Sequence, residues 1–202
     1  ILVNDAHITG DGEIGDPTET ALLRMAEEWG IDTAEYRKLH PRIAEIAFDS
    51  DRKLMSTLHK MDGENVLCTK GAVDVLLPRA THILTPEGKV PMAEKQKEAI
   101  LKTNRELSDQ GLRVLCFAIR KMGDTQALTV SDETDYTFVG LISMMDPPRE
   151  EAKIAVADAK MGGVKTVMIT GDHKVTASAI AKQLGILEPG TLAVDGSELD
   201  AM

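Results

Sequence analysis

Residues 43–71 read IAEIAFDSDRKLMSTLHKMDGENVLCTKG, and this stretch decides the fold class of the first part of the chain. Three apolar runs in it favour strands: Ile43–Phe48, Lys53–Lys60 and Glu64–Lys70. Asp62-Gly63, between the second and third runs, is a strong signal for a hairpin turn. The stretch therefore predicts neighbouring antiparallel strands with short connections.

Helices are predicted before and after these strands. Asp16 can cap a helix with Pro17 at its first position, and Glu19 can reach back as a capping-box partner. The pattern also predicts a short helix from Asp32, a long helix from about Met92 to Gln110, and strands over Arg113–Arg120 and Tyr136–Met145. We therefore expect an α+β fold, with an antiparallel sheet and flanking helices.

The chain changes character at Asp146-Pro147-Pro148-Arg149, where two prolines stiffen the segment as a hinge would require. Beyond this point the pattern predicts a helix to Met161, a buried strand over Lys165–Thr170, and a helix ending near Gly185. Such an order is typical of a parallel, doubly wound sheet. We expect one domain over residues 1–145 and part of an α/β domain over residues 146–202.

Composition limits the partners. The 202 residues carry a formal net charge of −10, so nucleic acid and direct contact with a membrane surface are disfavoured. Cys68 and Cys116 lie in apolar stretches without metal-ligand spacing, which indicates reduced core thiols in a cytosolic protein. No run is apolar enough to span a bilayer, and no signal peptide is visible. The chain starts at Ile1, and we expect it to be a piece of a longer protein.

Two short motif matches are poor evidence for a ligand or catalytic site. Gly10–Gly15 fits GxGxxG, but Asp11, Glu13 and Asp16 would repel a pyrophosphate there. Asp49-Ser50-Asp51 follows an apolar strand, as the catalytic pair of haloacid dehalogenase-type phosphatases does, but Arg52-Lys53 follows instead of the usual small residue. A Walker A loop, HExxH and GxSxG are all absent from the sequence.

Six short motifs occur in one order along the chain. They are Thr18-Glu19-Thr20-Ala21-Leu22, Phe48 with Lys53, Lys70-Gly71-Ala72, Leu112-Arg113-Val114-Leu115, Asp146-Pro147-Pro148-Arg149 and Thr170-Gly171-Asp172. Together they resemble the ordered signatures of P-type cation-transporting ATPases, in the branch that contains calcium pumps. The resemblance covers essentially the whole chain. It implies a nucleotide-binding domain, inserted in a haloacid dehalogenase-like phosphorylation domain to which the segment from Asp146 belongs.

The resemblance implies an ATP pocket. It places Phe48 against the adenine, Lys70 beside the adenosine, and Lys53 as a further pocket cation. Gly71 allows close backbone approach. By the same resemblance Arg113 contacts the phosphates, Leu115 lines the pocket, and Glu19 accepts a hydrogen bond from the adenine amino group.

Each of these residues also has a plainer interpretation. Phe48 could be a core aromatic residue at a strand end, and both lysines could be solvated. The capping box alone would account for Glu19. The turn at Thr170 could be a simple connection between a strand and a helix.

The resemblance also implies that the chemistry is incomplete in this chain. Thr170, Gly171, Asp172 and Asp146 would lie at the phosphate end of the site in a whole pump. The phosphorylated aspartate of an Asp-Lys-Thr-Gly-Thr motif, and the later aspartate that holds Mg²⁺, are absent from the sequence. We therefore expect a chain that binds ATP, as Mg-ATP in the parent enzyme, but holds no metal ion itself and does not transfer phosphate.

The expected partners are the phosphorylation, actuator and transmembrane domains of such a pump, at the cytoplasmic face of a membrane. Calcium is the expected cation. Two other functions remain open: a soluble haloacid dehalogenase-type phosphatase that uses Asp49 and Asp51, or an interaction module without a ligand.

Overall fold

The computed structural model describes residues 1–10, 12–145, 148–170, 174–194 and 198–199. The chain divides into two compact units, and one boundary between them falls within helix α4 (Glu94–Asp109). The first unit contains residues 1–102 and 114–144, and the second contains residues 103–113 and 145–202.

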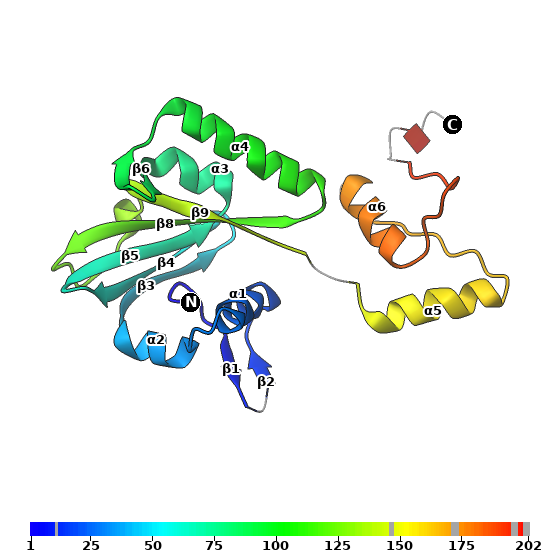
Figure 1. The fold of residues 1–202 in the computed structure, drawn as a ribbon, viewed down its shortest axis with the longest axis horizontal. Coiled ribbons are helices and arrows are strands. Elements are labelled where there is room, and N and C mark those ends of the chain that lie inside the picture. Colours follow the sequence, from blue (N-terminus) through cyan, green and yellow to red (C-terminus); the bar gives the residue numbers. More distant parts are fainter. Residues whose placement is uncertain (11, 146–147, 171–173, 195–197, 200–202) are drawn as a thin grey trace. The chain divides into compact units, whose positions relative to one another are not determined.

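A seven-stranded sheet forms the centre of the first unit (Figure 1). Its strands, in spatial order, are β3 (Arg42–Asp49), β4 (Leu54–Met61), β5 (Glu64–Gly71), β8 (Arg113–Gly123), β9 (Tyr136–Met144), β6 (Ala80–Thr85) and β7 (Gly88–Pro91). Strands β3, β4, β5 and β8 pair antiparallel, whereas β6 pairs parallel with β9. The predicted antiparallel sheet with flanking helices is confirmed for most of the sheet, and the parallel pairing of β6 with β9 departs from it.

Helices cover both faces of this sheet. Helices α1 (Pro17–Glu28) and α2 (Thr33–Leu39) lie on one face, and α3 (Val73–Leu76) and the first half of α4, residues 94–102, lie on the other (Figure 1). The remaining elements are a small hairpin of β1 (His7–Thr9) and β2 (Gly12–Ile14), and two 3₁₀ turns, η1 (Leu77–Arg79) and η2 (Val130–Asp132).

Helix α1 starts as the sequence predicts, with one correction. The Asp16 side chain accepts a hydrogen bond from the Thr18 amide at 2.8 Å, and Pro17 occupies the first turn. The capping-box role of Glu19 is wrong, because its carboxylate accepts a hydrogen bond from the Asp5 amide at 3.0 Å and pairs with Lys70. Glu19 therefore ties α1 to a strand and to the N-terminal segment instead of closing its own helix.

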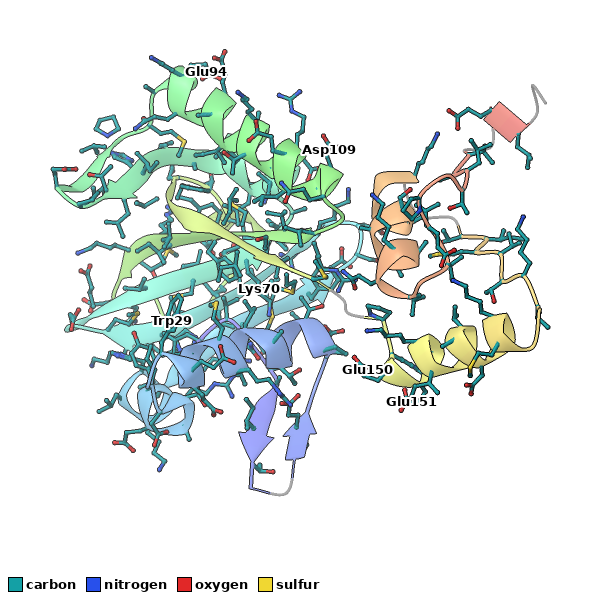
Figure 2. All side chains as sticks on the ribbon, turned by 45° about the vertical axis from the view of Figure 1, so that its right-hand side comes forward. Trp29, Lys70, Glu94, Asp109, Glu150 and Glu151 are labelled. Carbon is teal, nitrogen blue, oxygen red and sulfur yellow. The ribbon has the colours of Figure 1, made fainter. Side chains whose placement is uncertain are left out.

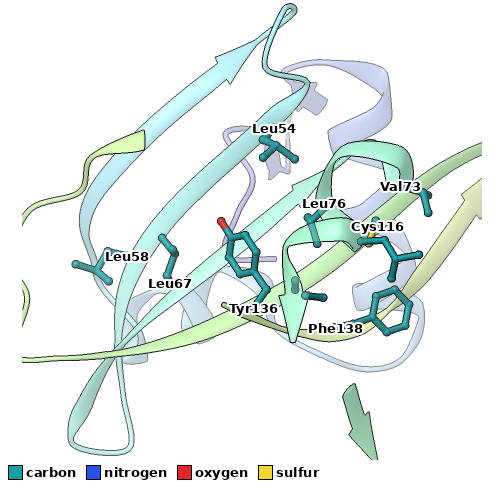
Figure 3. Close-up of a cluster of buried hydrophobic side chains, with 11 residues drawn as sticks. Leu54, Leu58, Leu67, Val73, Leu76, Cys116, Tyr136 and Phe138 are labelled. Atoms are coloured by element: carbon teal, nitrogen blue, oxygen red, sulfur yellow. The ribbon is translucent and has the colours of Figure 1, made fainter. Parts of the chain in front are cut away.

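The main hydrophobic core lies on the sheet face that α3 and α4 cover (Figure 3). Alternation along β4 and β5 sends Leu54, Leu58 and Leu67 to this face, where each is fully buried. Complete burial of such a side chain contributes about 1.5–3 kcal/mol. Cys116 lies in the same cluster, and burial raises the pKa of its thiol to about 12. Cys68 and Cys116 are both free, as predicted.

The second unit contains helices α5 (Glu150–Met161) and α6 (Lys174–Gln183). The predicted strand over Lys165–Thr170 is wrong, because these residues form no strand and Ile169 is 92% exposed. A strand needs a neighbour for its hydrogen bonds, and no described segment pairs with this one. A haloacid dehalogenase-like fold for this unit stays a prediction. Among the described residues, every helix is too short or too polar to cross a lipid bilayer.

Candidate functional site

The candidate site is built on the face of the sheet that α1 and α2 cover. Lys70, near the end of β5, pairs in register with Met55 on β4 and with Phe117 on β8. Residues directly opposite one another in a sheet share a face, so these three side chains form a row across it. The sequence pattern singled out Lys70 alone from this row.

Lys70 is buried and paired. The residue is only 7% exposed, and its ammonium group forms an ion pair with the Glu19 carboxylate on α1. Figure 2 shows Lys70 between the sheet and α1. The plainer interpretation of Lys70 as a solvated strand-end lysine is therefore wrong. A buried ammonium needs such a partner, because burial costs it several kcal/mol of solvation free energy. Removing one partner of a fully buried ion pair typically destabilises a protein by about 3–5 kcal/mol.

Phe48 lies on β3, two strands away from Lys70 on β5, and is open to solvent. The pairing of β3 with β4 is irregular between Ile46 and Asp49, where Ala47 and Phe48 together oppose Met55. Phe48 is 62% exposed, so it is not the core aromatic residue of the plainer interpretation. The bulge presents an aromatic ring next to the row of Met55 and Lys70.

Lys53 and Gly71 occupy the adjoining turn. The Lys53 side chain is about half exposed, and its ammonium lies 3.8 Å from the Asp74 carboxylate, which fits a solvated lysine. Gly71 has a structural reason for lacking a side chain, since a Cβ there would lie 2.2 Å from the Lys53 carbonyl oxygen. The absence of a side chain at Gly71 therefore allows the start of β4 to approach the end of β5. A role of Gly71 in ligand binding stays a prediction.

Leu115 and Arg113 belong to β8. Leu115 precedes Phe117 by two residues, so alternation places it on the face of Lys70, where it is half-buried. Arg113 is the first residue of β8 and is exposed. Their contacts with a nucleotide stay predictions.

The phosphate-end residues fall in the second unit. Thr170 is exposed and lies outside any helix or strand. Asp146, Gly171 and Asp172 lie outside the described residues. The role of this group stays a prediction.

The structure adds one group that the sequence pattern did not reveal. Arg52 and Arg79 both form ion pairs with Glu133, whose side chain is completely buried. Ser56 donates a hydrogen bond to the same carboxylate at 2.6 Å, and its hydroxyl lies 2.8 Å from that of Thr69. Glu133 stands in a polar run that reads as an ordinary loop, so no sequence signal marks it.

Two hollows of the first unit lie away from Phe48 and Lys70. One, of about 560 Å³, is lined by the β1–β2 hairpin and α1, including Glu13, Glu27 and Glu28. Its acidic lining suits no phosphate group, which agrees with discounting Gly10–Gly15 as a dinucleotide site. The other, of about 230 Å³, lies around His59, Arg37 and Arg42.

Comparison with known proteins identifies the family of the chain. Residues 1–151 match the family model described as "P-type ATPase, cytoplasmic domain N". The chain belongs to the P-type ATPase family. The Glu19–Lys70 pair and the exposed Phe48 both lie within the residues that match this P-type ATPase family model.

Three relatives of this P-type ATPase chain are named calcium-transporting ATPases. The chain is 43% identical to one from Listeria monocytogenes and 42% identical to one from Lactococcus lactis, over its whole length and 23% of each relative. It is 45% identical to one from Bacillus cereus, over 99% of the chain and 22% of the relative. The chain thus spans about a quarter of the length of these proteins.

Proposed function

We propose that this P-type ATPase chain binds ATP, with the adenine base stacked on Phe48. The observation that carries the proposal is an exposed aromatic ring on β3 and a buried lysine on β5, which flank Met55 of β4 in the register of the sheet. An exposed phenylalanine at a bulge has little value for the core. Stacking of a base on such a ring contributes about 1–3 kcal/mol.

The neighbouring charges support the same ligand. Lys70 is held in place by Glu19, which fixes an ammonium donor at the floor of the face. Each carboxylate oxygen of Glu19 has two lone pairs, so the hydrogen bonds from Asp5 and Lys70 leave capacity for an adenine amino group. Lys53, Gly71, Arg113 and Leu115 complete the proposed set, with Arg113 directed to phosphate.

In a complete protein, the bound ATP would supply phosphate for cation transport. The relatives' names make Ca²⁺ the proposed cation, and Mg²⁺ would arrive with the phosphates of ATP. The second unit would be part of a haloacid dehalogenase-like phosphorylation domain, after a boundary near residue 145. The proposed partners are the remaining domains of a pump, at the cytoplasmic face of a membrane. Phosphoryl transfer requires an aspartate motif that the sequence lacks, so we expect no ATP hydrolysis by this chain.

Calorimetric titration with ATP tests the proposal. We expect a Kd of roughly 0.1–1 mM for the wild type, or about −4 to −5.5 kcal/mol. Phe48→Ala should weaken binding by at least about fivefold, the lower end of a stacking contribution. Trp29→Ala is the matched control, because Trp29 is also exposed but lies at the end of α1. Equal loss in both variants, or no binding by the wild type at millimolar ATP, would reject the proposal.

A further inference from the structure

Glu133 is a charged residue with no access to solvent. It follows directly after η2, a turn that Thr129 and Asp132 close with reciprocal hydrogen bonds. Arg120 holds the same turn by donating a hydrogen bond to the Asp132 carbonyl at 2.7 Å. Because the turn is fixed from both sides, the Glu133 carboxylate projects into the protein at a defined place. Burying it would be costly without compensating cations and donors.

Two arginines and a serine supply that compensation. Arg52 approaches one carboxylate oxygen at 2.5 Å, and Ser56 donates to the same oxygen at 2.6 Å. Arg79 lies 3.5 Å from the other oxygen. The arginines come from segments far from Glu133 in the sequence, so the carboxylate joins three parts of the first unit.

Arg52 connects this carboxylate to the bulge that presents Phe48. Its second terminal nitrogen donates to the Ala47 carbonyl oxygen at 2.5 Å, and Ala47 is the other residue of the bulge. The Asp49 side chain accepts hydrogen bonds from the Asp51 and Arg52 amides at 3.1 and 2.7 Å. The loop after Phe48 is therefore closed on itself and fastened to Glu133 through one guanidinium group.

The same network reaches the strand of Lys70. The Ser56 hydroxyl lies 2.8 Å from that of Thr69, which in turn lies 2.8 Å from the Tyr136 hydroxyl. Thr69 precedes Lys70 on β5, and its side chain is fully buried. Glu133 thus supports β4 and β5 from the face opposite to Lys70.

We propose that Glu133 is a positioning residue for nucleotide binding, which sets the bulge of Ala47 and Phe48 through Arg52. The inference rests on the proposed function, since it assigns a cause to the placement of the stacking ring. Without the charge of Glu133, Arg52 and Arg79 would face each other as like charges, and Arg52 would lose the partner that holds it against Ala47. The ring would then sample other positions and spend less time in the stacking geometry.

Glu133→Gln tests this, because glutamine keeps the shape and can still accept the hydrogen bond from Ser56. Tyr136→Phe is the matched control, since it removes a hydroxyl from the same buried network without touching Arg52. We expect Glu133→Gln to raise the Kd for ATP about fivefold, and Tyr136→Phe to change it less than about twofold. Amide exchange at Asp51 and Arg52 should become about tenfold faster in Glu133→Gln alone, at a temperature where both variants are folded.

The outcomes separate the two proposals. If wild type binds ATP and Glu133→Gln binds it equally well, or if both variants weaken binding alike, the positioning role is wrong and the proposed function stands. If wild type does not bind ATP, the proposed function fails and this inference fails with it. Should Glu133→Gln not fold, Glu133→Asp replaces it, because a shortened carboxylate keeps the charge but withdraws it from Arg52; unchanged ATP binding in that variant would overturn the inference.

Discussion

At the scale of single residues, burial and pairing of Lys70 carry the most information. The ammonium group of Lys70 is shielded from solvent and is paired with one carboxylate, in a chain with a net charge of −10. Such a pair compensates for the lost solvation only when its geometry is well defined. Sequence motifs predicted that Lys70 and Glu19 belong to one site, but not that they contact each other. The reason is that they lie 51 residues apart, and only the packing of α1 on the sheet joins them.

Removing one partner of this pair should destabilise the fold. Lys70→Met leaves the Glu19 carboxylate with only the Asp5 amide. Because the Glu19 side chain is 14% exposed and keeps this hydrogen bond, we expect the free energy of unfolding to fall by about 2 kcal/mol, less than for a fully buried pair. Lys60→Met is the control, because Lys60 is an exposed lysine on the neighbouring strand β4. Urea unfolding monitored by circular dichroism measures both. A loss no larger for Lys70→Met than for Lys60→Met would contradict a buried, paired lysine.

At the scale of elements, the turn between β3 and β4 is hydrogen-bonded to the residues that follow β5. The Ala72 amide donates to the Lys53 carbonyl oxygen at 3.1 Å, and Gly71 packs against the same carbonyl. Lys53 itself has a positive φ of 55°, which is uncommon for a residue other than glycine. Local contacts of this kind fasten the turn that follows Phe48 to the end of the strand that carries Lys70.

Gly71→Ala should therefore disturb the site without altering a charge. The added Cβ would lie 2.2 Å from the Lys53 carbonyl oxygen and 2.6 Å from Leu54 Cδ2, so strands β4 and β5 would have to separate. We expect a loss of about 2 kcal/mol in the free energy of unfolding. Gly140→Ala on β9 is the matched control, since its Cβ would meet no atom within 4 Å. Equal thermal unfolding of the two variants would show that the close approach does not constrain the turn.

Sequence patterns predicted the long elements and missed the short ones. Helices α1, α2 and α4 and strands β3, β4, β5, β8 and β9 lie where apolar periodicity and caps predicted them. Strands β1, β2, β6 and β7 were missed, because runs of three to six residues are too short for a periodic signal. Pairing of β6 with β9 is parallel and distant in sequence, so no local turn signal marks it. The prediction of a strand over Lys165–Thr170 was wrong because an apolar run does not show whether a neighbouring strand is present to pair with it.

At the scale of the whole molecule, stability should depend on pH through a buried histidine. His59 is 2% exposed and contacts the His40 carbonyl oxygen through its Nδ1 at 2.9 Å. Burial lowers the pKa of His59 in the folded state and outweighs the hydrogen bond to the His40 backbone, which raises this pKa. The nearby charges of Arg42, His40 and Arg37 lower it further. The unfolded chain takes up a proton near the ordinary pKa of about 6.5, whereas the folded chain does so only at lower pH.

The free energy of unfolding should therefore decrease as the pH falls, because the unfolded chain then binds more protons than the folded chain. The contribution of His59 to stability is complete above pH ~6.5 and is lost as the pH falls toward the folded pKa, by up to about 1.4 kcal/mol per pH unit. We expect wild type to lose more in melting temperature between pH 7.5 and 5.5 than His59→Gln does. His82→Gln, at a half-exposed histidine on β6, should keep the wild-type dependence. An unchanged dependence in His59→Gln would contradict a buried neutral His59.

The central claim is that ATP binds at the part of the sheet that carries Phe48 and Lys70. An NMR titration of the ¹⁵N-labelled chain with ATP tests it most directly, because each amide reports its own surroundings. We predict that the amides of Phe48–Lys53 and Lys70–Ala72 shift together and saturate with one Kd. Shifts confined to the hollow between the β1–β2 hairpin and α1, or no shifts at millimolar ATP, would contradict the account.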